Sequence, residues 1–154
     1  MPNLKVILVG GGSIEKELKD KSKKLNIEEY VDFPGYLPPE ELPSYINASD
    51  ICIIPHLKSG HTDNTIPHKL FQYMILQKLV IGSDCNPIKR IIYETKAGIV
   101  YKNDSPIELA KAVIKAYYMD RAKIGLNGKN AVVTKYNWAS TVKTLLEIYD
   151  YKNL

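Results

Sequence analysis

A stretch in the middle of the chain joins a polar loop to the start of a predicted helix. It runs from Asp63 to Met74 (DNTIPHKLFQYM), and Pro67 stands where the helix is predicted to begin, since proline is favoured at a first helical position. The first amides of a helix lack intrahelical acceptors, and the helix dipole adds partial positive charge beside them. Gln72, which can donate and accept hydrogen bonds, follows within the helix. These residue types suit a diphosphate at the helix start and ribose hydroxyls at Gln72.

A second candidate site follows the first predicted strand. The apolar run Leu4–Val9 is closed by Gly10, Gly11 and Gly12. Glycines let the backbone approach a ligand closely, and the start of a following helix favours an anion. A glycine-rich turn is at least as often only a tight turn, so this motif alone is weak evidence of a site.

The elements that position both segments alternate regularly along the chain. Short apolar runs predict strands at Leu4–Val9, Tyr30–Phe33, Ile51–Ile54, Leu79–Ile81 and Gly98–Tyr101. Helical spacing predicts helices at Ser13–Leu25, Glu40–Ala48, Pro67–Leu76, Pro87–Thr95, behind the capping box Ser105–Glu108, and at Asp120–Lys135 and Trp138–Tyr149. The alternation predicts an α/β fold, a three-layer, doubly wound (Rossmann-like) parallel sheet of about five strands. Ligands of such sheets bind beyond the carboxyl ends of the strands, where both candidate sites fall.

Composition narrows the class of protein. The chain has 154 residues, 45% hydrophobic and 25% charged, which predicts a single globular domain over residues 1–154. Its net charge of +4 suits an anionic small molecule and does not demand nucleic acid. Cys52 and Cys85 lack metal-ligand spacing, and the three histidines have no matching Cys or Glu cluster, so no metal site is expected. We expect reduced thiols in a cytoplasmic protein without a targeting segment.

The run PHKLFQYM, followed by LVIGSD, resembles a motif of the group 1 (family 4) retaining glycosyltransferases. Further segments are similar to that family in the same order: LKVILVGGG, YVDFPGYLPPEEL, ASDICIIP, AGIVY and SPIELAKAV. The likeness extends from Leu4 to Tyr149 and is specific as an ordered set. It implies the C-terminal domain of such an enzyme, which binds the nucleotide-sugar donor and forms half of a GT-B fold.

The resemblance assigns roles near the helix start. The family has two glutamates separated by seven residues, of which the first contacts the donor sugar and the second holds the ribose. Asn64 and Gln72 stand at these positions, and both lack the carboxylate. The backbone from Thr65 to Pro67 falls where the family holds the donor diphosphate and sugar. Asn64 is therefore the candidate catalytic residue that the resemblance implies.

Other residues receive roles in the same way. Tyr36 and Leu37 fall where the family reads the nucleobase edge by backbone, and Lys69 could add positive charge beside the diphosphate, although a surface lysine fits equally well. The candidate substrate-binding residues are Gly11, Gly12, Tyr36, Leu37, Asn64, Thr65, Ile66, Pro67, Lys69 and Gln72.

The family also implies a reaction and partners. The donor is a UDP- or GDP-sugar, bound as a substrate with no cofactor, and the sugar passes with retention to a polysaccharide or glycolipid acceptor. The acceptor-binding N-terminal domain and the first βα unit of the nucleotide domain have no counterpart in this chain, so the isolated chain is expected to transfer no sugar. Peripheral membrane association of the full enzyme fits the lysine-rich stretch Lys16–Lys24, for which a solvated helix face is the favoured interpretation.

Three other functions compete with this interpretation. A non-enzymatic nucleotide-binding or regulatory module would not need the missing carboxylates. A dinucleotide-dependent oxidoreductase is disfavoured, because Gly10–Gly12 lacks a third glycine at the required spacing and Asp32, the nearest acidic residue, precedes the end of the second strand. A receiver-type signalling domain would need an acidic cluster at strand ends, which the sequence does not contain.

The resemblance makes a further prediction about the sheet. The absent strand belongs in the middle of the family's strand order 3-2-1-4-5-6. We expect Leu4–Val9 and Ile51–Ile54 to pair directly, since two buried rows of unpaired backbone groups would be too costly. Numbered along this chain, the five strands would then lie in the order 2-1-3-4-5. The alternative is a strand lent by another chain, which would make an obligate oligomer.

Overall fold

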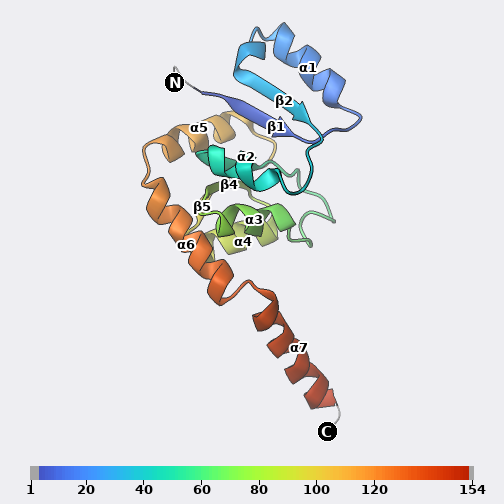
Figure 1. The fold of residues 1–154 in the computed structure, drawn as a ribbon, viewed down its shortest axis with the longest axis vertical. Helices are drawn as coiled ribbons and strands as arrows, with labels where there is room; N and C mark the ends of the chain where they lie inside the picture. Colours follow the sequence, from blue (N-terminus) through green and yellow to red (C-terminus); the bar gives the residue numbers. More distant parts are fainter. Residues whose placement is uncertain (1–3, 153–154) are drawn as a thin grey trace. The chain divides into compact units, whose positions relative to one another are not determined.

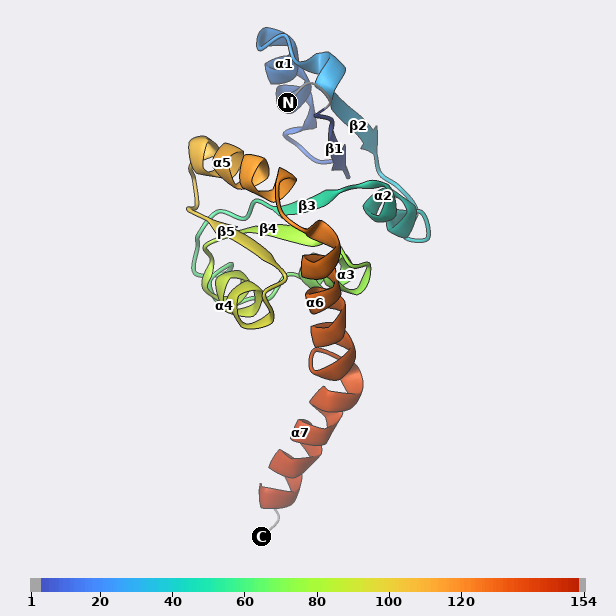
Figure 2. The same cartoon turned by 90° about the vertical axis from the view of Figure 1, so that its left-hand side faces the viewer.

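A computed structural model describes residues 4–152, and the side chains of residues 4–149 (Figures 1 and 2). The chain divides into two compact units, Met1–Ser44 and Tyr45–Leu154, which are described separately. The first contains β1 (Val6–Val9), α1 (Glu15–Lys24), the 3₁₀ turn η1 (Glu28–Tyr30) and β2 (Val31–Gly35), and α2 (Leu42–Ala48) crosses the boundary. The second contains β3 (Ile51–Ile54), α3 (His68–Ile75), β4 (Leu79–Ser83), α4 (Asn86–Thr95), β5 (Gly98–Tyr101), α5 (Pro106–Tyr117), α6 (Arg121–Thr134) and α7 (Trp138–Lys152).

The first unit is a pair of parallel strands with one helix beside it. Val6 of β1 is opposite Val31 of β2. The ammonium group of Lys19 on α1 lies 5.6 Å from the centre of the Phe33 ring on β2. The side chains of β1 stay partly open to solvent, with Ile7, Leu8 and Val9 each about 40% exposed. This unit therefore has an incompletely covered sheet.

The second unit is a three-layer arrangement built around β4. Its three strands are parallel in the order β3-β4-β5, with Cys52 opposite Val80 and Ile81 opposite Ile99. Because successive side chains of a strand point to opposite faces, Val80 packs with α3 and α4 while Leu79 and Ile81 pack with α5. Figure 2 shows α5 on one side of these strands and α3 and α4 on the other. The predicted α/β fold with parallel strands and helices on both faces is confirmed.

The predicted pairing of the first strand with the third would join the two units, and it stays a prediction. Within the first unit β1 is hydrogen-bonded to β2, and within the second unit β3 is hydrogen-bonded to β4. One domain over 1–154 stays a prediction.

Several helix starts follow their sequence signals closely. The hydroxyl of Ser105 accepts a hydrogen bond from the amide of Glu108 at 3.3 Å, and the side chain of Asn137 accepts one from the amide of Ser140 at 2.9 Å. Pro67 is the residue before α3 and not its first residue, so that helix begins one position later than expected. No helix among residues 4–152 is both long and apolar enough to cross a membrane.

Two glycines let α6 lie close to α3 and the turn behind it. Gly125 and Gly128 are buried, although both sit inside a helix. A Cβ atom on Gly125 would lie 1.9 Å from the carbonyl oxygen of Gln77, and one on Gly128 would lie 3.2 Å from the side chain of Met74. The absence of side chains there sets the distance at which α6 packs.

Gly125→Ala should therefore destabilise the chain although alanine favours helices. The added methyl group must displace backbone, and we expect the free energy of unfolding to fall by about 2 kcal/mol or more. Gly60→Ala is the matched control, because no heavy atom lies within 4 Å of its added Cβ, and it should change stability by less than about 0.5 kcal/mol. Urea denaturation measures both. Equal stability of the two variants would contradict close packing at Gly125.

Candidate functional site

The first unit brings two of its candidate residues together where its strands end. The amide of Gly10 donates to the carbonyl of Gly35 at 2.8 Å, and both glycines have positive φ, +118° and +75°. A Cβ on Gly11 would lie 3.0 Å from the Tyr36 ring, which is itself 85% exposed. Gly11 and Tyr36 are thus neighbours at one edge of a parallel pair. The close approach of a ligand to Gly11 and Gly12, and the contact of Tyr36 and Leu37 with a nucleobase edge, stay predictions.

In the second unit the candidate residues lie in the loop before α3 and on its first turns. Residues 64–67 lead into the helix, which starts at His68. Pro67 is the residue before it and accepts a hydrogen bond from the amide of Leu70 at 3.0 Å. Within residues 4–152, no acceptor is found for the amides of His68 and Lys69. Two backbone donors are therefore available at a helix start that has no acidic residue in its first turn, as an anion site requires.

The side chain of Asn64, the candidate catalytic residue, is used inside its own loop. Its amide nitrogen donates to the carbonyl of Gly60 at 2.7 Å, and the Thr65 hydroxyl lies 3.5 Å from Nδ1 of His61. Asn64 and Thr65 are exposed, as is Gln72 one turn into α3, whereas Ile66 is half-buried. The Asn64 carbonyl oxygen and the Gln72 side chain remain the groups able to meet a ligand.

Positive charge gathers around the loop that follows β3. Burial, and then the charges of Lys69 and His61, lower the pKa of the His56 imidazole below its usual value. Lys69 is half-buried on the first turn of α3. Its predicted role beside a diphosphate stays a prediction.

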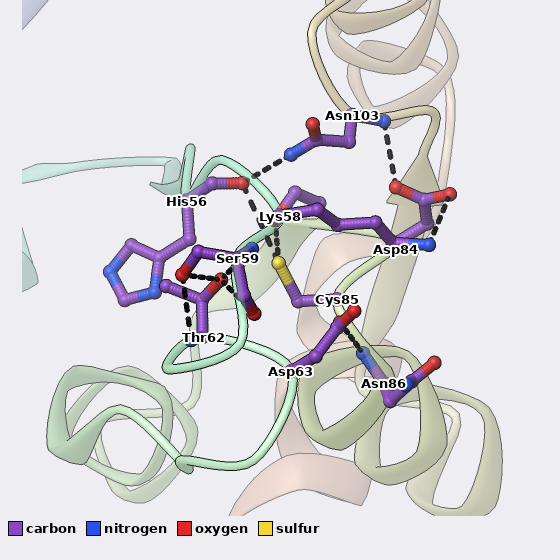
Figure 3. A network of polar contacts seen from close by, with 10 residues as sticks. His56, Lys58, Ser59, Thr62, Asp63, Asp84, Cys85, Asn86 and Asn103 are labelled. Atoms are coloured by element: carbon purple, nitrogen blue, oxygen red, sulfur yellow. Dashed lines mark hydrogen bonds and ion pairs between the residues drawn. The ribbon is translucent and has the colours of Figure 1, made fainter.

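Polar residues after the three strands form a network that the sequence reading did not single out (Figure 3). The Asp84 carboxylate accepts a hydrogen bond from the amide of Asn103 at 2.8 Å and lies 3.4 Å from the ammonium group of Lys58. The side-chain amide of Asn103 donates to the carbonyl of His56 at 2.6 Å. Each of these residues follows a strand by one to four positions, so the rule that strand ends carry polar site residues could have found them.

Both cysteines are free and buried, and burial raises the pKa of the Cys52 thiol to about 11. Among the residues that the structure describes, no group of three or more His, Cys, Asp and Glu side chains is arranged to hold a metal ion.

The chain matches known proteins over nearly its whole length. Residues 1–131 match the family model described as glycosyl transferases group 1. The chain is 28% identical over 148 residues to an uncharacterized glycosyltransferase of Methanocaldococcus jannaschii, covering 94% of this chain and 36% of that protein. It is 25% identical over 146 residues to the amylovoran biosynthesis glycosyltransferase AmsK of Erwinia amylovora, covering 93% and 36%. The chain thus spans about a third of the length of these curated relatives.

Solved structures share the fold. The Anabaena protein HepE, solved in complex with UDP, aligns with a TM-score of 0.85 at 17% identity and covers 98% of this chain and 42% of that one. The C-terminal domain of a group 1 glycosyl transferase, LpcC, from Francisella tularensis aligns with a TM-score of 0.74 at 23% identity, covering 89% and 72%. Together with the match over residues 1–131, this agreement means that the chain belongs to the group 1 glycosyltransferase family.

Proposed function

We propose that the second unit binds the diphosphate and ribose of a nucleotide-sugar donor, and that the chain is the donor-binding part of a retaining glycosyltransferase. The observation that carries this is the start of α3. Among residues 4–152 the amides of His68 and Lys69 have no acceptor, and Lys69 itself stands on the first turn of that helix. An anion gains from backbone donors, the helix dipole and a cationic side chain at the same place.

The same features suit the chemistry of sugar transfer. As the bond between sugar and diphosphate breaks, negative charge grows on the leaving phosphate. Donors and positive charge already fixed in place stabilise that charge without reorganising at the moment of reaction. In this proposal the residues before α3 and Lys69 hold the leaving diphosphate. Gln72 accepts a hydrogen bond from the ribose, and Asn64 turns its free carbonyl oxygen toward the sugar.

The identities of donor and acceptor rest on the relatives. HepE was solved with UDP, which supports a uridine nucleotide as the first donor to test, with a GDP-sugar as the alternative. AmsK is named for amylovoran biosynthesis, which supports a polysaccharide acceptor. Since the chain spans 36% of these relatives, we propose that a further domain holds the acceptor.

A non-enzymatic nucleotide-binding module is the second candidate. Neither Asn64 nor Gln72 carries a carboxylate, and the Asn64 amide is held by Gly60. Such a module would bind UDP and a UDP-sugar equally, because it makes no use of the sugar. A donor-binding domain would distinguish them.

Calorimetric titration of the purified chain tests nucleotide binding directly. We expect UDP or GDP to bind weakly and NAD not to bind, because the proposed site suits a diphosphate and the sequence has no acidic residue at the end of the second strand to hold a dinucleotide ribose. Titration of UDP-glucose beside UDP then separates the two candidate functions. Tighter binding of NAD than of either nucleoside diphosphate would refute the proposal.

Gln72→Glu should strengthen nucleotide binding. A carboxylate accepts a stronger hydrogen bond from ribose hydroxyls than a neutral amide does, and we expect a gain of about 1 kcal/mol, or about fivefold in Kd. Gln77→Glu is the control. Gln77 is also exposed and lies just beyond the other end of α3, so its replacement by glutamate adds the same charge away from the site. If both variants bind UDP with the wild-type affinity, Gln72 does not contact the nucleotide.

A further inference from the structure

The loop between β3 and α3, residues 57–66, is anchored at its start through the backbone carbonyl of His56, which accepts hydrogen bonds from two other segments. The carbonyl oxygen of His56 accepts a hydrogen bond from the side-chain amide of Asn103 at 2.6 Å and a weaker one from the thiol of Cys85 at 3.6 Å. Figure 3 shows both donors converging on this oxygen from the segments after β5 and β4. The exit of β3 is thereby tied to the ends of both other strands.

Asn103 is in turn fixed by Asp84. Its backbone amide donates to the Asp84 carboxylate at 2.8 Å, and the other carboxylate oxygen lies 3.4 Å from the ammonium group of Lys58 inside the loop. Partial burial opposes ionisation of Asp84, but the Asn103 amide and Lys58 outweigh it, so the pKa of this carboxyl group is lowered. A charged acceptor therefore orients Asn103 at neutral pH, with its side chain directed at His56.

The loop keeps its shape through its own polar groups. The Thr62 hydroxyl donates to the carbonyl of Leu57 at 2.6 Å and accepts from the amide of Ser59 at 2.8 Å. The Asn64 side chain closes the second half of the loop onto Gly60. These bonds lie inside the loop, so the position of Asn64 relative to the sheet depends on where the loop is attached.

The far end of the loop has a separate attachment. The Asp63 carboxylate accepts a hydrogen bond from the amide of Asn86, the first residue of α4, at 3.0 Å. Asp63 thus caps α4 and not the helix that follows it in sequence. Asn103 at one end and Asp63 at the other fix the loop against the sheet.

We propose that Asn103 is a positioning residue for the donor: by holding the His56 carbonyl it sets the loop that carries Asn64 and leads into α3. This rests on the proposed function for the identity of the ligand, though not for the order of the loop. Asn103 itself needs no contact with the donor. A purely stabilising asparagine would affect unfolding and leave the affinity of the folded chain unchanged.

Asn103→Ser tests this, with Asn127→Ser as the matched control. Asn127 is also half-buried, and its side-chain amide also donates to a carbonyl distant in sequence, that of Lys96, at 3.3 Å. Serine is too short to reach the His56 carbonyl. The full 154-residue chain is titrated with UDP, and amide hydrogen exchange is followed at Ser59, Thr62 and Asn64 without ligand. We expect Asn103→Ser to raise the Kd for UDP at least fivefold and to speed exchange in the loop at least tenfold, while Asn127→Ser changes neither.

Each outcome separates the inference from the proposed function. If the wild-type chain binds no nucleotide, the proposed function fails, and faster loop exchange in Asn103→Ser alone would then limit Asn103 to ordering the loop. If the wild-type chain binds UDP and Asn103→Ser binds equally well, Asn103 is not a positioning residue. Should Asn103→Ser fail to fold, Asn103→Asp makes the same test with the shape of the side chain kept, because an ionised carboxylate cannot donate to the His56 carbonyl. Asn103→Asp must then bind UDP more weakly than the wild-type chain. Equal affinities would overturn the proposal.

Discussion

The second unit depends on the burial of β4 on both faces. All five residues of this strand are buried, and its side chains alternate between a core shared with α3 and α4 and a core shared with α5. The contact is close enough that a Cβ on Gly82 would lie 2.4 Å from the side chain of Ile88. When both faces of an apolar strand are covered, polar side chains can be placed only at its two ends. This constraint directs the chemistry of the unit to the carboxyl ends of β3, β4 and β5.

At those ends, the backbone itself has to be satisfied. A partly buried carbonyl such as that of His56 is costly unless it accepts hydrogen bonds, and here Asn103 supplies one. The groups that complete the fold at this edge are therefore the groups that fix the loop before α3. Stability and site geometry are linked because the same few side chains serve both.

The sequence predicts the elements well because their signals are local. Apolar runs and caps placed β3, α5 and α7 within a few residues, since Ile51–Ile54, Ser105 and Asn137 carry their information in neighbouring positions. Whether β1 pairs with β3 depends on how segments distant in sequence meet, and no local pattern reports that. The role of Asp63 was hidden from the sequence, because its partner, Asn86, is 23 residues away.

The neutral residues of the site acquire a physical reason from the loop. A glutamate in place of Asn64 could not donate to the carbonyl of Gly60, because an ionised carboxylate only accepts hydrogen bonds; it would set two acceptors against each other at 2.7 Å. Asparagine avoids this conflict, because its amide nitrogen donates to the Gly60 carbonyl while its carbonyl oxygen can still accept a hydrogen bond from a ligand. The loss of the carboxylate at this position is thus coupled to a loop that holds its own shape. In the proposed function, the helix start and Lys69 then hold the anion, and neither of them needs a carboxylate partner.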